Sequence, residues 1–235
     1  MPLFVTLFSK TFLILGSQLL IMLIGAKAAL AFIRNLYAEG AAGVPASRSD
    51  HGGVDIRIGW EFIGPYFSGL LMLDIFLFLF LMFYGIENLR IGVPVFFTWS
   101  AIVGAQVALA LVTFDADLGT RVLAIAVLIA LLAALAGMYQ GMASSALLKS
   151  LFFALTGLTI FGIMRLLLSI QRSAQRVSAL FGVLAFTCYL LFDFHHLHRL
   201  GRASANNWHG AMSVSISVYL DVINLFFDLL DAISR

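Results

Sequence analysis

Long apolar runs separated by short polar stretches dominate the pattern of this chain. A helix that crosses a membrane needs roughly 20 mostly apolar residues. Seven runs meet this requirement, at residues 11–33, 63–86, 92–114, 122–140, 146–169, 177–198 and 210–231. The pattern therefore predicts an all-α fold, a bundle of seven transmembrane helices that forms a single integral membrane domain over residues 1–235.

The connections between these runs differ in length. Residues 34–62 are rich in charged residues around a Gly-Ala-Ala-Gly-Val-Pro-Ala-Ser segment, which predicts a flexible, solvated loop. The other connections are short, which favours a compact bundle of sequential antiparallel helices. Small residues recur in the runs, as at Ala101, Gly104 and Ala108, and they allow helices to approach closely in lipid.

Composition supports a membrane protein and excludes several other classes. The 235 residues are 62% hydrophobic and 11% charged, whereas soluble domains are about 25% charged. The net charge of +2 and the scattered basic residues exclude a nucleic-acid-binding protein. Cys188 is the only cysteine, which excludes an internal disulfide and a cysteine metal cluster. Lysine and arginine are divided too evenly between the two sides to predict orientation.

Two acidic residues interrupt the last two apolar runs. Asp193 lies in the sixth run and Asp221 in the seventh. An ionisable group in hydrocarbon is costly and usually functional. Both residues are equally far along the chain from Asn207, in the polar break between the runs, so an antiparallel helix pair places them at similar depth.

Helical spacing predicts that each acid belongs to a polar stripe. In the last run the stripe comprises Ser213, Ser217, Asp221, Asn224 and Asp228, all at i+3 or i+4 intervals. In the sixth run the residues that share a face are Tyr189, Asp193 and His196. Polar stripes on membrane helices face protein or a water-filled cavity, so the two stripes are expected to form a polar seam.

The chemistry of two neighbouring carboxyl groups leaves three roles open. Both cannot ionise cheaply in a low dielectric, so one is expected to keep a proton and the pair to titrate as a unit. Such a pair can act as a pH-dependent switch, or can offer oxygen ligands to calcium once deprotonated. The structural alternative is a neutral, hydrogen-bonded pair that only joins two helices. Asn224, Ser217 and Tyr189 are candidates for hydrogen-bond support, and Asp228 for the lining of an exit.

The segments around the two acids resemble signatures of the Bax inhibitor family. Tyr219-Leu220-Asp221-Val222-Ile223-Asn224-Leu225-Phe226, followed by Leu229-Leu230, is similar to its last-helix signature. Leu190-Leu191-Phe192-Asp193 resembles its penultimate-helix motif. The resemblance implies six helices around a central seventh, with Asp193 and Asp221 as a pH-sensing pair near the cytoplasmic end.

The resemblance also implies a function. Family members are associated with pH-dependent calcium leak and, in eukaryotes, with suppression of cell death. We therefore expect a bacterial-type member in the bacterial inner (plasma) membrane, a non-enzymatic and cofactor-free cation leak that handles calcium or protons and is gated by the aspartate pair. The alternative, also from relatives, is a non-conducting regulator that binds a membrane-anchored protease or another membrane protein.

One family feature is displaced in this chain. Relatives can latch the acid pair with an arginine at the end of the second helix. The matching position here is Ile86, and Arg90, one helical turn further on, is the candidate latch.

Other ionisable residues suggest two further sites. His195, His196 and His198 follow Asp193, and these residues are candidate zinc ligands together with it. The favoured interpretation is that the imidazoles lie at a helix end that faces the membrane interface. Lys27 and Asp74 lie within the first two runs, and we expect them to form an ion pair because either charge alone would be costly.

Overall fold

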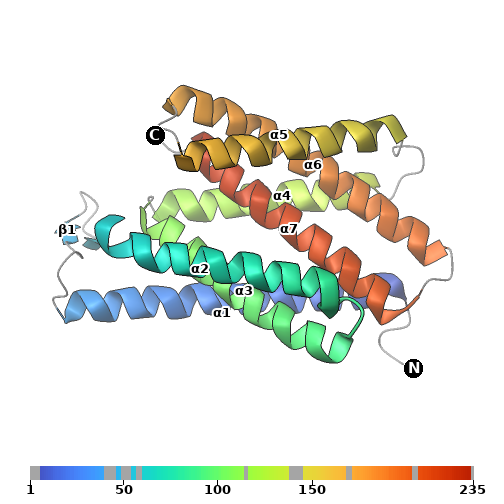
Figure 1. Ribbon diagram of the computed structural model, residues 1–235, viewed down its shortest axis with the longest axis horizontal. Coiled ribbons are helices and arrows are strands. Elements are labelled where there is room, and N and C mark those ends of the chain that lie inside the picture. Colours follow the sequence, from blue (N-terminus) through green and yellow to red (C-terminus); the bar gives the residue numbers. More distant parts are fainter. Residues whose placement is uncertain are drawn as a thin grey trace. The chain divides into compact units, whose positions relative to one another are not determined.

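A computed structural model describes residues 6–39, 46–48, 54–56, 60–113, 116–137, 145–167, 171–202 and 206–233. These residues form seven α-helices (Figure 1): α1 (Leu7–Ala38), α2 (Trp60–Phe80), α3 (Leu89–Thr113), α4 (Ala116–Gly137), α5 (Ser145–Leu167), α6 (Arg172–Arg202) and α7 (Trp208–Ile233). The predicted all-α fold of seven helices is therefore confirmed.

Several helices are suited to cross a membrane by length and composition. In the described part of the chain four segments meet both criteria: Leu7–Leu36, Gly64–Gly85, Leu89–Leu111 and Arg172–Arg202. Shorter apolar helical segments cover Arg121–Gly137 and Ser150–Gly162. Large apolar side chains are exposed on these helices, among them Phe76 at 62% and Phe153 at 71%. Such exposure is unfavourable in water and is expected for side chains that face lipid.

The polar connection between α1 and α2 contains structure that the sequence pattern did not predict. Helix α1 continues to Ala38, and two short strands follow, β1 (Ala46–Arg48) and β2 (Val54–Ile56). They pair antiparallel, with Ala46 opposite Ile56. Strands of three residues are too short to show a period of two, which explains why the sequence indicated only a loop.

The second span ends in a wider helical turn. Residues Leu81–Gly85 form a π-helix, η1, and the Ile86 N–H donates to the Leu81 carbonyl oxygen at 3.1 Å. The Gly92 backbone of α3 packs directly against the Gly85 backbone. A Cβ at Gly92 would therefore overlap the Gly85 carbonyl oxygen. The α2–α3 connection is thus a tight turn that relies on two glycines.

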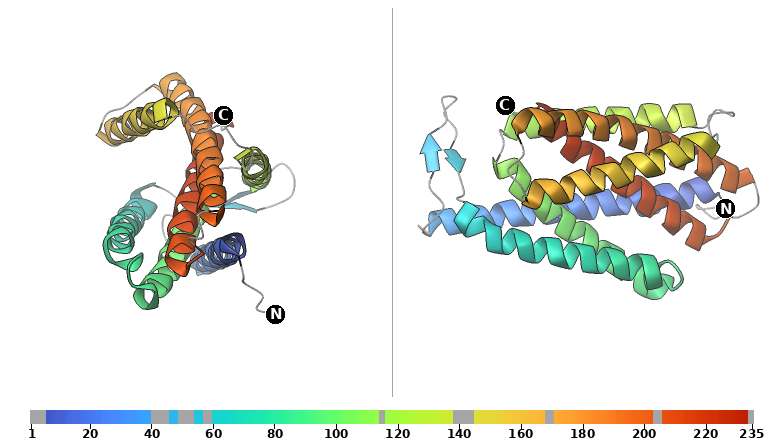
Figure 2. Two further views of the ribbon diagram at one scale, coloured as in Figure 1. Left: turned by 90° about the vertical axis from the view of Figure 1, so that its right-hand side faces the viewer. Right: turned by 45° about the horizontal axis from the view of Figure 1, so that its top comes forward.

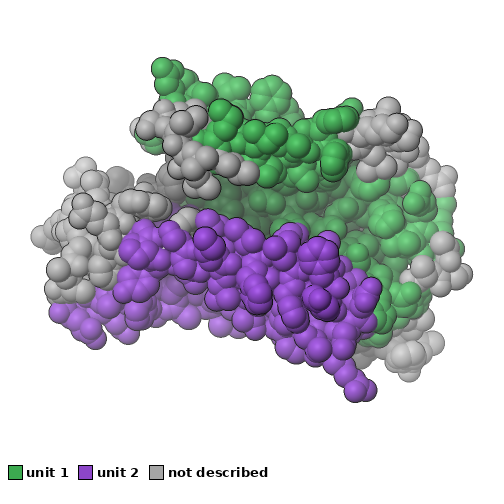
Figure 3. All heavy atoms as spheres, viewed as in Figure 1, with its two compact units in different colours: residues 1–15, 117–235 green, residues 16–116 purple. Residues whose placement is uncertain are grey.

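The chain divides into two compact units (Figure 3). The C-terminal unit comprises residues 1–15 and 117–235, and the N-terminal unit comprises residues 16–116. The first turns of α1 therefore belong with α4 to α7, and the rest of α1 belongs with α2 and α3.

In the C-terminal unit, α6 and α7 pack along each other (Figures 1 and 2). Fourteen of the 26 residues of α7 are buried, which agrees with the expected central position of the last helix. The Ser215 hydroxyl lies 3.0 Å from the Thr11 carbonyl oxygen and 2.7 Å from that of Ala211, and ties α7 to the start of α1. Lys10 Nζ donates to the backbone and side-chain oxygens of Asn206, at 3.1 and 2.9 Å.

In the N-terminal unit, small residues bring α1 and α3 together. A Cβ at Gly104 would overlap the Met22 carbonyl oxygen, and one at Gly25 would overlap that of Ala101. Nearby, the buried Ser100 hydroxyl lies 2.5 Å from Gln18 Oε1. This contact agrees with the expectation that small residues allow close approach of helices in lipid.

Asp74 is partnered by neutral donors in place of the expected lysine. The Trp99 indole N–H donates to Asp74 Oδ1 at 2.5 Å, and the Gln106 side chain, whose amide donates to the Leu70 carbonyl oxygen at 3.5 Å, lies close to the carboxyl group. Lys27 is exposed, and no ion pair joins it to Asp74 in the described residues. The predicted Lys27–Asp74 pair is therefore wrong. The neutral indole donor stabilises the acid without the cost of burying a second charge.

We expect Gly104→Leu to destabilise the protein by about 1–3 kcal/mol, because the new side chain would force α1 and α3 apart. Gly69→Leu is the matched control, since a Cβ at Gly69 meets nothing within 4 Å. Chemical unfolding in detergent, followed by tryptophan fluorescence, measures both changes. Equal losses of unfolding free energy in the two variants would contradict close packing at Gly104.

We expect Trp99→Phe to cost about 1–3 kcal/mol of unfolding free energy, because Asp74 loses its indole donor. Adding Asp74→Leu should recover part of this loss, since no acid then lacks a partner. Lys27→Met should have little effect. A Lys27→Met variant as unstable as Trp99→Phe would support the ion pair after all. The same unfolding assay compares all four proteins.

Candidate functional site

The α6–α7 pair brings Asp193 and Asp221 together. Asp193 is half-buried on α6, and Asp221 is only 8% exposed on α7. The two carboxyl groups are close enough to interact electrostatically. The residues that flank Asp221 on α7 are largely buried and apolar, so the interaction takes place in a low dielectric, where charges act strongly on each other.

Neither carboxyl group has a hydrogen-bond or ion-pair partner among the residues that the structure describes. Asp221 Oδ2 is fully enclosed and accepts no hydrogen bond. A buried polar atom without a partner is costly, and more so when it is charged. The site can reduce this cost by binding a proton or a cation.

The residues predicted to support the pair lie within one helical turn of one of the two acids. Tyr189 is half-buried one helical turn before Asp193, and interacts electrostatically with both acids. Ser217 and Asn224 are half-buried on α7, one turn before and one turn after Asp221. The predicted polar stripe of α7 thus continues past the pair in both directions.

Beyond Asn224 the stripe reaches a polar cavity. The cavity has a volume of about 310 Å³ and lies among α5, α6 and α7. Asn224, Asp228 and Asp231 line it from α7, and Gln175 and Ser178 from α6. Asp228, predicted to line an exit, therefore lies at the wall of an actual cavity. Polar groups at this position in a membrane bundle indicate a place that water can occupy.

The sequence interpretation missed the α6 side of this cavity. A Cβ at Gly182 would overlap the carboxyl group of Asp228, so this carboxyl group packs directly against the Gly182 backbone of α6 and would have to move for any larger residue. Gln175, Ser178 and Gly182 follow one another at helical spacing, which is a signal of a second small and polar stripe. That signal precedes Asp193 on the same helix and was visible in the sequence.

The histidines after Asp193 pack against aromatic rings. The His196 ring stacks on Phe192, with centroids 6.4 Å apart and planes at 6°. The His198 ring meets the edge of Phe8, at 6.3 Å. Among the described residues, no group of three or more histidine, cysteine or acidic side chains is arranged to hold a metal ion, and this applies to His195 as well. A calcium ion at the aspartates would therefore need carbonyl or water oxygens as its other ligands.

The candidate latch belongs to a different part of the chain. Arg90 is exposed at the start of α3, in the N-terminal unit. Its role as a latch stays a prediction.

Comparison with known proteins identifies the family. The sequence profile of the family described as "Inhibitor of apoptosis-promoting Bax1" matches residues 5–235, nearly the whole chain. A search of curated proteins finds no match. The profile match and the bundle of seven helices agree with one another. The chain is an integral membrane protein that belongs to the Bax inhibitor family.

Proposed function

We propose that this protein is a pH-sensitive cation leak, with calcium as the favoured ion, and that Asp193 and Asp221 gate it. One observation carries the proposal: two acids interact within the α6–α7 pair, and neither has a hydrogen-bond or ion-pair partner in the described residues. An unpartnered acid pair in a membrane bundle responds to protons and cations more readily than one that donors already satisfy.

The direction of the pH effect follows from the chemistry of the pair. When both carboxyl groups are ionised, their charges repel, and a divalent cation between them removes the repulsion. A proton on either acid also removes it, but takes away a calcium ligand. Protons and calcium therefore compete for the same oxygens, so acidification weakens calcium binding and alters the gate.

The polar stripe of α7 supports a route for the ion. Asn224 and Asp228 follow one face of the helix from the pair to the 310 Å³ cavity, and Ser217 lies on the same face one turn before the pair. Hydroxyl, amide and carboxylate oxygens at one-turn intervals can replace part of the hydration shell of a moving cation. In this mechanism the pair is the gate and Asp228 lines the exit.

The proposed activity involves no catalysed reaction and no resident cofactor. On the resemblance to bacterial-type members, we place it in the bacterial plasma membrane, with calcium or protons as the ions handled. The alternative is a non-conducting regulator of a membrane-anchored protease. Purified protein that passes no calcium at any pH, and that is isolated from cells with such a protease, would favour the alternative.

We expect Asp221→Asn to abolish the pH response of calcium flux, because an amide cannot titrate. Asp193→Asn should do the same, and the double variant should match the single ones, since the two acids act as a unit. The assay uses purified protein in vesicles loaded with a calcium indicator, between pH 5 and 8.

Glu87→Gln is the matched control, because it makes the same acid-to-amide change at an exposed residue between α2 and α3. It should retain the pH response of the unmodified protein. A response that persists unchanged in Asp221→Asn would remove the pair from the mechanism.

We expect Asp228→Asn to lower calcium flux severalfold and to leave its pH response intact, because this acid lines the cavity rather than the gate. The same vesicle assay separates the two effects as amplitude and pH dependence. Loss of the pH response in this variant would make Asp228 part of the sensor.

A further inference from the structure

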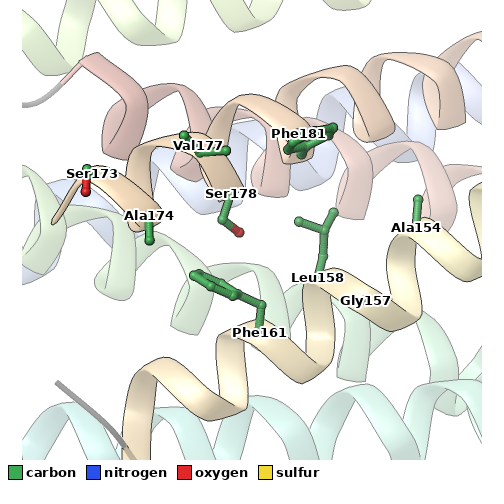
Figure 4. A pocket seen from close by; sticks show the side chains of 9 residues that line it. All are labelled: Ala154, Gly157, Leu158, Phe161, Ser173, Ala174, Val177, Ser178 and Phe181. Atoms are coloured by element: carbon green, nitrogen blue, oxygen red, sulfur yellow. The ribbon is translucent and has the colours of Figure 1, made fainter. Parts of the chain in front are cut away.

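An apolar groove runs between α5 and α6 in the C-terminal unit (Figure 4). Its volume is about 610 Å³, within the range of about 300–1,000 Å³ typical of small-molecule sites. Leu158 and Phe161 form its α5 wall, and Val177 and Phe181 its α6 wall. The lining residues extend over about two turns of each helix, roughly 10 Å, so the groove suits a narrow, elongated apolar group.

The groove is open on the side that faces away from the protein. Val177 is 54% exposed and Phe181 64% exposed, and a Cβ at Gly157 would meet nothing within 4 Å. Both helices are apolar, and α6 is long enough to cross a membrane. In a bilayer such an open apolar space is filled by hydrocarbon.

Two arginines lie near one end of the groove. Arg172 and Arg176 are exposed in the first turns of α6, one helical turn apart, and directly precede the lining residues Ser173 and Val177. The start of a long helix adds a partial positive charge. Guanidinium groups recognise phosphate through paired hydrogen bonds, and basic sites beside membrane helices bind anionic lipid headgroups.

We propose that this groove binds an anionic phospholipid, with one acyl chain between α5 and α6 and its phosphate at Arg172 and Arg176. The apolar walls match the acyl chain of such a lipid, and the two arginines at the end of the groove match the phosphate at the end of that chain. Binding does not depend on the ion leak proposed above.

The bound chain would also cover a wall of the polar cavity. Leu158, Phe161 and Ser178 line both the groove and the cavity that contains Asp228. Polar groups cannot face hydrocarbon without cost. An ordered acyl chain against this shared wall would keep the cavity closed toward the bilayer.

A second copy of this chain is the competing occupant. Ala154 and Gly157 are small and would accept a neighbouring helix. The arginines favour the lipid, because a phosphate matches two cations and an apolar helix face does not.

Native mass spectrometry of the full-length protein tests the proposal, with phosphatidylglycerol and phosphatidylcholine of the same acyl chains as probes. The unmodified protein should retain phosphatidylglycerol preferentially. Arg172→Gln and Arg176→Gln should each reduce this preference about fivefold. Gly157→Leu should lose bound lipid of both kinds, because its side chain would enter the groove.

Two matched variants are the controls. Arg202→Gln removes an exposed arginine at the other end of α6, and Gly69→Leu adds the same side chain at an open position on α2. Both should bind lipid as the unmodified protein does.

Three results would overturn the proposal. They are equal retention of the two lipids by the unmodified protein, an unchanged preference in both groove arginine variants, and unchanged lipid binding by folded Gly157→Leu. A dimer that Gly157→Leu dissociates, without a change in bound lipid, would assign the groove to a second copy. If Gly157→Leu does not fold, the exposed arginine variants still decide the outcome.

Discussion

The placement of Asp193 and Asp221 within electrostatic range of each other is the constraint that the packing of the C-terminal unit has to accommodate. Two carboxyl groups can share a low-dielectric space only if the helices that carry them hold a fixed register. The burial of more than half of α7 supplies that register. The Ser215–Thr11 contact ties α7 to the start of α1, and Gly182 admits the Asp228 carboxyl group against α6. Packing around α7 thus serves to position acids.

Close approach of helix backbones stabilises helix association in this protein, a role that burial of apolar side chains has in soluble proteins. Lipid tails are as apolar as leucine, so apolar side chains alone give helices little reason to associate. In the N-terminal unit, Gly25 and Gly104 let α1 and α3 meet at backbone distance. In the C-terminal unit, a Cβ at Gly137 of α4 would lie 2.6 Å from the Leu191 carbonyl oxygen of α6. Both units therefore rely on missing side chains, while their large apolar residues remain available to lipid.

Sequence predicted the features that depend on one helix at a time. Apolar length gave the seven helices, and spacing within the last run placed Asp221, Asn224 and Asp228 on one face. The sequence-based prediction was wrong where the interaction partner of a residue lies on another helix. Lys27 and Asp74 have opposite charges, but charge alone cannot show that Trp99 and Gln106 face Asp74 from α3. The β1–β2 pair and the π-turn at Leu81–Gly85 are likewise set by local backbone hydrogen bonds, which leave no apolar period to detect.

The acids in the two units differ in the hydrogen-bond donors that surround them. Asp74 accepts a hydrogen bond from Trp99 and lies close to the Gln106 side chain, so its carboxyl group has a donor whether or not ions are present. The oxygens of Asp193 and Asp221 have no such donors in the described residues, and each acid experiences the charge of the other. Occupied oxygens resist change, because a proton or cation must displace existing hydrogen bonds. Carboxyl oxygens that lack donors and lie near a like charge are stabilised when they bind a proton or a cation. The absence of donors among the described residues therefore supports the pH-sensing role that we propose for the α6–α7 pair, and not for Asp74.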